Sequence, residues 1–202
     1  WDFAPLLSLQ ARPMTIARKL ALQVLFALLG MGVMTAWFLV SERKLILEER
    51  QTGVRQVVEV AHGIAVHFHT LSTKGAMPDE EARQRAAAAM QALRYSGNEY
   101  IWINDMHPRM VMHPVRPELN GQDLSANKDP NGLPLFMEFV RIVKTQGAGF
   151  VPYMWPKAGS DIPVEKTSYV KGFEPWGWVI GSGVYIDTVN AAIWKRAMGF
   201  GA

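Results

Sequence analysis

Residues 100–114 read YIWINDMHPRMVMHP, residues 149–157 read GFVPYMWPK and residues 166–187 read KTSYVKGFEPWGWVIGSGVYID. Aromatic and β-branched residues are frequent in these stretches, and Pro and Gly interrupt them, a pattern that predicts short antiparallel strands. The strands also carry His and Lys at interior-looking positions. Because a cation is costly to bury alone, the pattern indicates a small sheet around a pocket that binds an anion.

The rest of the chain predicts helices and one long loop. Apolar residues recur at helical spacing from Leu47 to Leu71, and Asp79, as the expected N-cap after Pro78, opens a second helix that ends near Leu93. The predicted elements that follow are strands at 100–105 and 109–114, a loop at 120–134, a helix at 135–144, strands at 150–155, 166–173 and 178–185, and a helix at 186–196. This order predicts an α+β domain with an antiparallel sheet and its helices at one side.

Residues 20–41 form an uncharged, mostly apolar run of 22 residues. At ~1.5 Å per residue the run makes roughly 33 Å of helix, enough to cross a hydrocarbon core of about 30 Å, so it predicts a transmembrane helix. The alternative is a cleaved signal peptide, but the run exceeds the usual apolar region of ~7 to 15 residues and no A-x-A cleavage site follows it. Basic residues flank both ends about equally, so charge alone does not set the orientation.

The composition excludes several classes of protein. The chain has 202 residues, 49% of them hydrophobic, which suits one ordinary domain plus an anchor. The net charge of +3 is small and scattered, so nucleic-acid binding is not expected. Cysteine is absent, and no G-x-S-x-G, H-E-x-x-H or Walker motif occurs. We therefore expect no enzyme; a hydrolase has only isolated His and Asp residues in its favour.

Eight residues are predicted to form a site for a small carboxylate. A guanidinium at Arg94 can hold a carboxylate through two parallel hydrogen bonds, and Lys166 can add a point charge. Tyrosine hydroxyls can orient the ligand while aromatic rings exclude water. The predicted site residues are Arg94, Tyr100, Trp102, His113, Tyr153, Trp155, Lys166 and Tyr169.

Strand alternation supports only part of this set. Aromatic residues two positions apart, in the strands at 100–105 and 150–155, share one face of the sheet. Lys166 and Tyr169 are three positions apart, so they point to opposite faces unless a bulge intervenes. The pairing of these two residues in one pocket is therefore the weakest element of the prediction.

Structural roles remain open for several of these residues. The two cations alternatively lie exposed or pair with nearby acids, namely Glu99, Asp105 or Glu165. His113 is alternatively a structural histidine. His62 and His69 share a helix face but lack zincin spacing, so neither a metal nor a cofactor is expected.

Five segments resemble the single Cache family of extracytoplasmic sensor domains. The resemblance spans about residues 43–187, and its motifs occur in the same order as in that family. The segments are LRYSGNEYIWIND (93–105), MHPVRPELNGQDL (112–124), KDPNGLPLFMEFV (128–140), GFVPYMWPK (149–157) and SYVKGFEPWGWVIGSGVYID (168–187).

The resemblance implies a PAS-like antiparallel sheet, a long N-terminal helix leading from the membrane, and a pocket for a short carboxylate. With the transmembrane helix expected at 20–41 after a tail at 1–19, the resemblance implies a periplasmic sensor domain at 42–196 and a truncated segment at 197–202. Such domains commonly serve methyl-accepting chemotaxis receptors in the inner membrane, so a homodimer is expected. The alternatives are an anchored solute-binding protein or the input domain of a sensor kinase.

Overall fold

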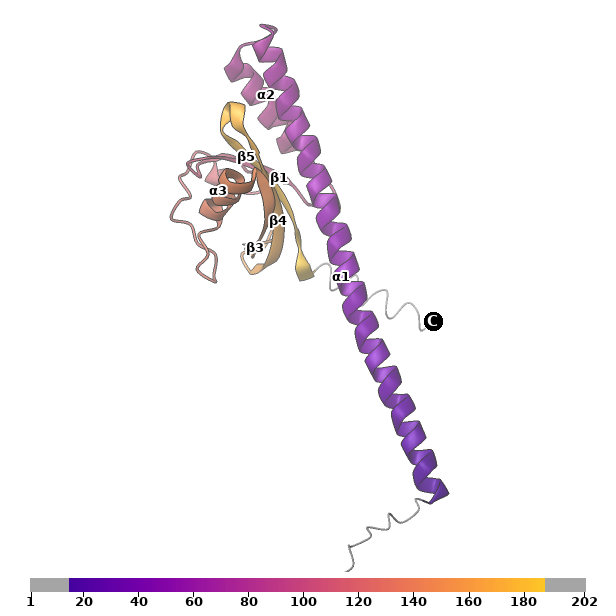
Figure 1. Cartoon of the computed structure of the whole chain (residues 1–202). Helices are drawn as coiled ribbons and strands as arrows, with labels where there is room; N and C mark the ends of the chain where they lie inside the picture. Colours follow the sequence, from indigo (N-terminus) through magenta and orange to yellow (C-terminus); the bar gives the residue numbers. More distant parts are fainter. Residues whose placement is uncertain (1–14, 188–202) are drawn as a thin grey trace, which may run out of the picture. The chain divides into compact units, whose positions relative to one another are not determined.

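The computed structural model describes residues 15–187. The chain divides into two units, residues 1–42 and residues 43–202, and one helix, α1 (Ile16–Thr73), belongs to both. The predicted transmembrane segment and the amphipathic helix predicted after it thus both lie within one helix (Figure 1). The predicted helix at 186–196 and the segment at 197–202 lie almost entirely outside the described residues.

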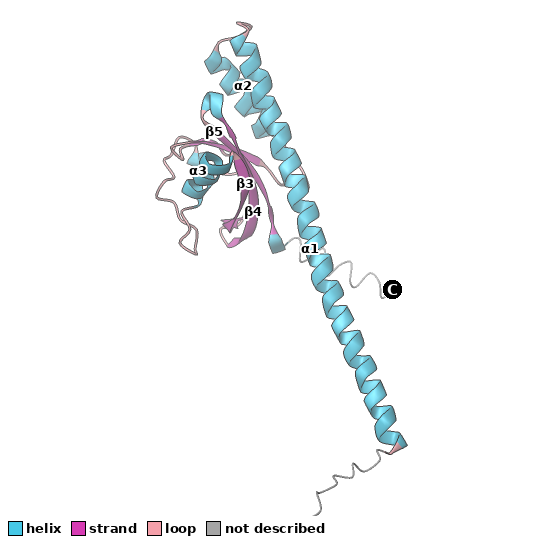
Figure 2. Cartoon of the chain, in the orientation of Figure 1, coloured by secondary structure: helices cyan, strands magenta, loops and turns pink. Residues whose placement is uncertain are grey.

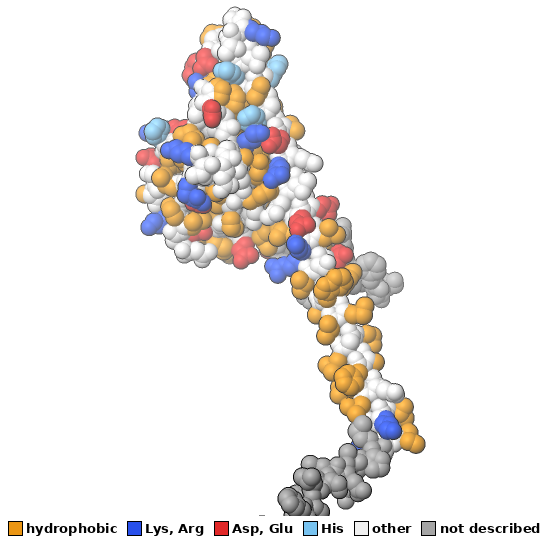
Figure 3. All heavy atoms as spheres, in the orientation of Figure 1, with side chains coloured by type: hydrophobic (Ala, Val, Ile, Leu, Met, Phe, Trp, Pro, Cys, Tyr) orange, Lys and Arg blue, Asp and Glu red, His pale blue; other side chains and the backbone are white. Residues whose placement is uncertain are grey.

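The first unit presents apolar side chains along α1. The most apolar 18-residue window of this helix has a mean hydropathy of 2.1, and none of it is buried. Figure 3 shows these hydrophobic side chains along the helix, and Trp37 and Val40 are about 70% exposed. By length and composition, α1 can cross a membrane.

The second unit is an α+β domain, as predicted, with all strand pairs antiparallel (Figure 2). The sheet order is β2-β1-β5-β4-β3. After α1 the elements are α2 (Asp79–Ala92), β1 (Ile101–Asp105), β2 (Met110–Met112), the 3-10 helix η1 (Pro117–Leu119), α3 (Leu135–Gln146), β3 (Ala148–Pro156), β4 (Pro163–Phe173), the 3-10 helix η2 (Glu174–Trp176) and β5 (Trp178–Tyr185).

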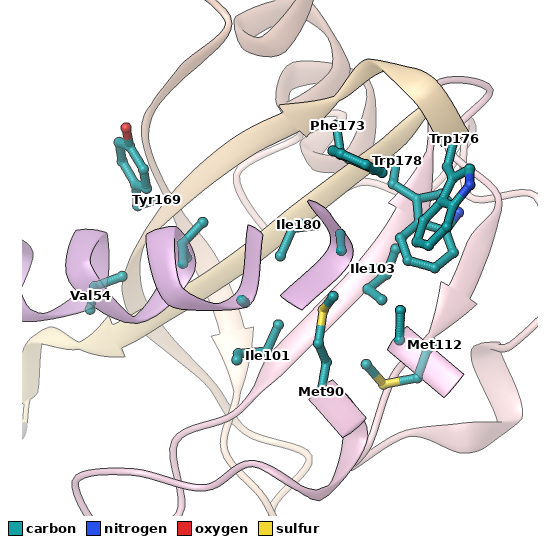
Figure 4. Packing of buried hydrophobic residues seen from close by; sticks show 14 of the residues in the cluster. Val54, Met90, Ile101, Ile103, Met112, Tyr169, Phe173, Trp176, Trp178 and Ile180 are labelled. Atoms are coloured by element: carbon teal, nitrogen blue, oxygen red, sulfur yellow. The ribbon is translucent and has the colours of Figure 1, made fainter. Parts of the chain in front are cut away.

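One face of the sheet packs against α1 and α2. Val54, Val58, Ala61 and Ala65 recur every three or four residues along α1 and are all buried, as a helix with one apolar face requires. They share a cluster with small side chains of α2 and with apolar residues of β1 and β5. Figure 4 shows this core, which has its aromatic end at Phe173, Trp176 and Trp178.

The opposite face packs against α3, so the prediction that all helices lie at one side of the sheet is wrong (Figure 1). The buried residues of α3 are Leu135, Phe136, Phe139, Val140, Ile142 and Val143. Gly172 of β4 permits the close approach, because a Cβ there would lie 2.5 Å from Cγ1 of Val143. The sheet therefore has two different covers, and the second one encloses the candidate site.

The N-cap of α2 differs from the prediction, and the position of Pro152 within a strand has a structural explanation. Pro78, and not Asp79, occupies the N-cap of α2; the Asp79 carboxylate instead accepts hydrogen bonds from Arg83 and from the Trp176 indole. Pro152 lies in β3, which is an edge strand, where a missing backbone donor leaves no ladder bond unmade in the centre of the sheet.

Candidate functional site

The side chain of Lys166, on β4, is 1% exposed. Its Nζ donates hydrogen bonds to the hydroxyls of Tyr100 (3.3 Å) and Tyr185 (3.4 Å). The same atom lies 4.3 Å and 4.4 Å from the centroids of these two rings and 5.9 Å from that of Trp102. Within residues 15–187 no carboxylate lies within ion-pairing distance of Lys166. Phenol and ring contacts offset only part of the cost of burying an ammonium group.

His113 follows β2 and is also buried. Its Nδ1 accepts hydrogen bonds from the backbone amides of Val115 (3.3 Å) and Arg116 (2.9 Å). Burial, together with the positive charges of Lys166 and Arg116, lowers the pKa of His113 to about 3. The imidazole is therefore neutral near pH 7, and because Nδ1 accepts, its proton resides on Nε2.

An internal cavity lies between the sheet and α3. The volume of this cavity is about 10 Å³, which is room for about one water molecule. Its lining residues are Tyr100, Trp102, His113, Leu135, Phe136, Phe139, Tyr153 and Trp155. Five of the eight predicted site residues thus line one cavity, and Lys166 contacts two of those five.

The other polar groups around the cavity are held in place by hydrogen bonds. The Tyr153 hydroxyl and Oγ of Ser168 are 2.9 Å apart, and Nε1 of Trp102 donates to the Asn104 side chain at 3.2 Å. Burial is the main reason that the pKa of Tyr153 is raised well above its usual value, so its hydroxyl keeps its proton. Lys166, His113 and Tyr153 therefore present hydrogen-bond donors in one buried region.

Two glycines of β5 make room for these side chains. A Cβ at Gly181 would lie 2.3 Å from Cζ2 of Trp102, and a Cβ at Gly183 would lie 2.0 Å from Oγ of Ser168. Contacts this short do not occur between real side chains, so only glycine fits at either position without movement of its neighbours. The alternation of Gly181 and Gly183 in β5 therefore shapes the floor of the site.

Arg94 lies elsewhere. It is exposed just after α2, and its Nη1 donates to the carbonyl oxygens of Gln91 and Leu93, both at 2.7 Å. It lines an open groove of about 610 Å³ beside α1 together with Arg50, among other residues. The prediction that Arg94 joins Lys166 in one site is therefore wrong. The Arg94 side chain stays at the end of α2, which ends at Ala92, and the sheet begins only at Ile101.

Tyr169 also lies apart from Lys166. The strand β4 pairs regularly from Lys166 to Phe173, so a separation of three residues turns Tyr169 to the face covered by α1. There its ring lies 4.9 Å from the Phe150 ring and 5.2 Å from the Arg55 guanidinium carbon. The prediction that Tyr169 shares a pocket with Lys166 is therefore wrong, because β4 is regular between the two residues and no bulge turns them to the same face.

The sequence prediction missed Tyr185 and Ser168. Tyr185 is paired directly with Lys166 in the β4–β5 register, and its hydroxyl donates to the Pro156 carbonyl at 2.9 Å. Alternation places Ser168 on the face of Lys166, a signal that was available in the sequence. The register of β5 against β4 was not available, and it alone brings Tyr185 to the site.

No group of three or more His, Asp or Glu side chains suited to a metal occurs among the described residues. His62 and His69 on α1 instead contact the Phe173 ring edge to face, with centroids 5.4 Å and 5.7 Å away. Burial and the charge of Lys171 lower the pKa of His62. Both histidines thus take part in the packing between α1 and the sheet.

A family model described as the Cache domain matches residues 34–199. Among characterised proteins, the methyl-accepting chemotaxis protein McpP of Pseudomonas putida is 42% identical over 180 residues, covering 89% of this chain and 33% of McpP. The sensor histidine kinase MctS of Rhizobium johnstonii is 31% identical over 124 residues, covering 61% of this chain and 27% of the kinase. The chain thus spans about a third or less of these relatives.

Two solved structures are also similar. One, described as the periplasmic sensor domain of a chemotaxis protein, is 55% identical with a TM-score of 0.68, covering 69% of this chain and 96% of that domain. The other, described as a Cache chemosensory domain that recognises carboxylic acid, is 48% identical with a TM-score of 0.68, covering 70% of this chain and 97% of that domain.

Proposed function

The chain belongs to the Cache family of sensor domains, and we propose that it is the periplasmic input part of an inner-membrane chemotaxis receptor that binds a short carboxylate. One observation carries the choice of ligand. Lys166 is a fully buried ammonium group that has hydroxyls and aromatic rings around it, and no carboxylate of residues 15–187 lies within ion-pairing distance of it, although the Glu99 carboxylate acts on it from further away. An anionic ligand supplies the missing partner.

The neighbouring groups suit a carboxylate. Lys166 provides charge, and the Nε2 proton of His113 and the hydroxyl of Tyr153 provide directed donors for the two carboxylate oxygens. The aromatic side chains of Trp102, Phe139 and Trp155 enclose a cavity that has room for about one water molecule, so even acetate must displace these side chains to enter it. Because a longer alkyl chain demands a larger displacement, we expect acids with two or three carbons to bind better than longer ones.

Binding would be transmitted through the sheet to α1. Arg55 of α1 stacks on the Tyr169 ring of β4, and Glu59 of α1 forms an ion pair with Lys171 of the same strand. A ligand that prefers one arrangement of β4 over another shifts the population of α1 positions by its difference in affinity. A homodimer would place two copies of this helix within reach of each other.

A sensor-kinase input domain is the second candidate, and the similarity to MctS favours it. The two candidates use the same pocket and differ only in the output module. Joining residues 1–187 to the signalling part of McpP, and separately to that of MctS, discriminates between them. The fusion protein whose signalling output changes when acetate is added identifies the output module that this sensor domain can control.

The experiment that tests the pocket is a thermal-shift measurement on the full chain in lipid nanodiscs. The ligands are acetate and propionate, with ethylamine and glucose as non-acidic comparisons. A ligand at ~100 times its dissociation constant adds about 2.7 kcal/mol to stability. We expect the two acids to stabilise the wild type and to lose this effect in Lys166→Met, which replaces the ammonium with an apolar group of similar length.

The matched control is Lys144→Met, which removes an exposed lysine from α3. It should leave the stabilisation by acetate unchanged. Retention of full acetate affinity by Lys166→Met, in a variant that unfolds cooperatively, would refute the assignment of the pocket.

A further inference from the structure

Glu99 lies next to the site but plays no part in the ligand contacts described above. Reciprocal backbone hydrogen bonds of 3.1 and 3.2 Å between Glu99 and Tyr95 hold it in a tight turn directly before Tyr100. Its Oε2 is buried, and no group within residues 15–187 forms a hydrogen bond with it. A buried, unpartnered carboxylate oxygen is costly, so its environment bears directly on whether the group carries a charge.

Charges from several elements act on Glu99. Burial raises the pKa of this carboxyl, while the positive charges of Lys166, Lys157 and Arg50 oppose that rise and the negative charge of Asp187 adds to it. These cations lie on β4, after β3 and on α1, respectively. The described groups that interact electrostatically with Glu99 also include the phenols of Tyr95, Tyr153 and Tyr185.

Lys166 is shared between this carboxylate and the cavity. It is the first of the three cations that favour the charged form of Glu99, and its Nζ also contacts Tyr100 and Trp102, which line the cavity. A ligand carboxylate beside Lys166 would place a second negative charge close to that lysine. The same positive charge cannot fully compensate both anions in a buried environment.

We propose that Glu99 takes up a proton from solvent when a carboxylate binds beside Lys166, so that ligand binding is linked to pH. This inference rests on the proposed function, because it requires an anion in the cavity. The charges balance: the ligand brings one negative charge and the proton one positive charge, and the product is a neutral carboxylic acid at Glu99. No other co-reactant is needed.

The direction of the pH effect follows from linkage. The liganded state binds protons more tightly than the free state, so affinity for the acetate ion rises as pH falls through the Glu99 titration of the complex. It stops rising once Glu99 is protonated in both states. In the ligand-free protein the pKa of about 3 keeps His113 neutral above about pH 4. An anion nearby raises that pKa, so the Glu99→Gln variant is needed to separate the two groups.

Protonation of Glu99 also changes the connection to α1. Arg50 of α1 is one of the three cations that interact with the Glu99 carboxylate. When Glu99 becomes neutral, this attraction between α1 and the turn before β1 is lost. The proton taken up at Glu99 therefore links an occupied cavity to a charge on the membrane-proximal helix.

The test is calorimetric titration of the full chain in nanodiscs with acetate at several values from about pH 5 to about pH 8, a range above the ordinary carboxyl value of ~4.3. At each pH the titration is repeated in phosphate and in Tris, whose ionisation enthalpies differ. The difference in measured heat divided by the difference in ionisation enthalpy gives the number of protons taken up. Concentrations are expressed as the acetate ion.

We expect the wild type to take up a fraction of a proton that peaks within this range, with a matching rise in affinity at lower pH. Glu99→Gln keeps the shape of the side chain but cannot titrate, so its uptake should fall to zero and its affinity should become independent of pH. Glu165→Gln is the matched control, because Glu165 is the exposed neighbour of Lys166, and it should behave as the wild type.

The outcomes separate the two proposals. If acetate and propionate fail to bind the wild type, both the carboxylate site and the proton linkage are wrong. If acetate binds and the wild type shows no proton uptake at any pH, or if Glu99→Gln retains the uptake, the linkage alone is overturned. If Glu99→Gln loses acetate affinity at all pH values while its proton uptake is unchanged, another group takes up the proton.

Discussion

The two faces of the sheet are built from different side chains although they share the same five strands. The face against α1 and α2 is filled by aliphatic, alanine and aromatic residues, and its charged groups, such as Lys171 with Glu59, lie at its edge in ion pairs. The face against α3 buries Lys166 and His113 among aromatic rings. The first face is packed almost entirely with apolar side chains, and the second buries polar groups beside the small cavity where we propose that the ligand binds.

This comparison predicts that the largest losses of stability come from the α1 face. Ile180 is fully buried there in β5, and Ile180→Ala should destabilise the domain by about 2 to 5 kcal/mol, because it removes methylene groups and leaves a cavity. Urea unfolding measures the change. The acetate-induced increment in stability should persist in the variant; its loss would show that the two faces do not act separately.

On the α3 face, a smaller change should damage both stability and binding. Gly181→Ala brings a Cβ to 2.3 Å from the Trp102 ring, so the ring must move at a cost of about 1 to 3 kcal/mol, and its wall of the cavity moves with it. Gly53→Ala, on α1, is the control because a Cβ there meets no atom within 4 Å; it should be neutral or stabilise the helix by roughly 0.5 to 1 kcal/mol. Urea unfolding and acetate titration of both variants provide the comparison, and unchanged acetate affinity in Gly181→Ala would contradict the role of the Trp102 ring.

The polar face should also respond to pH more strongly. His113 has a pKa of about 3 in the folded protein, against 6.5 for the free side chain. Because the unfolded chain binds the proton more readily, stability contributed by neutral His113 is present above about pH 6.5 and is lost as pH falls toward about pH 3. The loss approaches ~1.4 kcal/mol per pH unit in the middle of this range.

His113→Gln removes this contribution, so its stability should depend less steeply on pH between about pH 6 and pH 4. Urea unfolding of wild type and variant across this range measures the difference in slope. Equal slopes would mean that His113 is protonated in the folded protein, and the tautomer assigned from the Val115 and Arg116 amides would then be wrong.

The sequence predicted the order of most elements and most of the residues that line the cavity, but it did not predict the register in which the strands pair. Aromatic residues two apart in β1 and β3 were expected on shared faces, and Tyr100, Trp102, Tyr153 and Trp155 do line one cavity. Period-two alternation is local, so the sequence reveals it. Which strand lies beside which is set by long-range pairing, and that is why Tyr185 was missed.

The position of Arg94 shows a second limit of prediction from the sequence, in this case a residue that was wrongly included in the site. An arginine just before an aromatic strand looked like a ligand residue, but helix α2 ends at Ala92 and the chain turns through residues 93–99 before reaching the sheet. The guanidinium satisfies carbonyl oxygens left unpaired at that helix end, a common use of a cation at a C-terminus. The direction of a side chain after a helix depends on the turn, which composition does not specify.

The smallest predicted effect tests this reassignment. Arg94→Ala should leave the dissociation constant for acetate unchanged, because Arg94 lies outside the cavity, and it should reduce stability by about 0.5 to 1.5 kcal/mol through the lost hydrogen bonds to Gln91 and Leu93. Calorimetric titration and urea unfolding of the same preparation measure both quantities. A tenfold loss of acetate affinity with little change in stability would instead move the ligand to the groove of about 610 Å³ that Arg94 lines beside α1. The contrast between the two faces would then no longer describe where binding occurs, because the anion would lie next to α1 and not against α3.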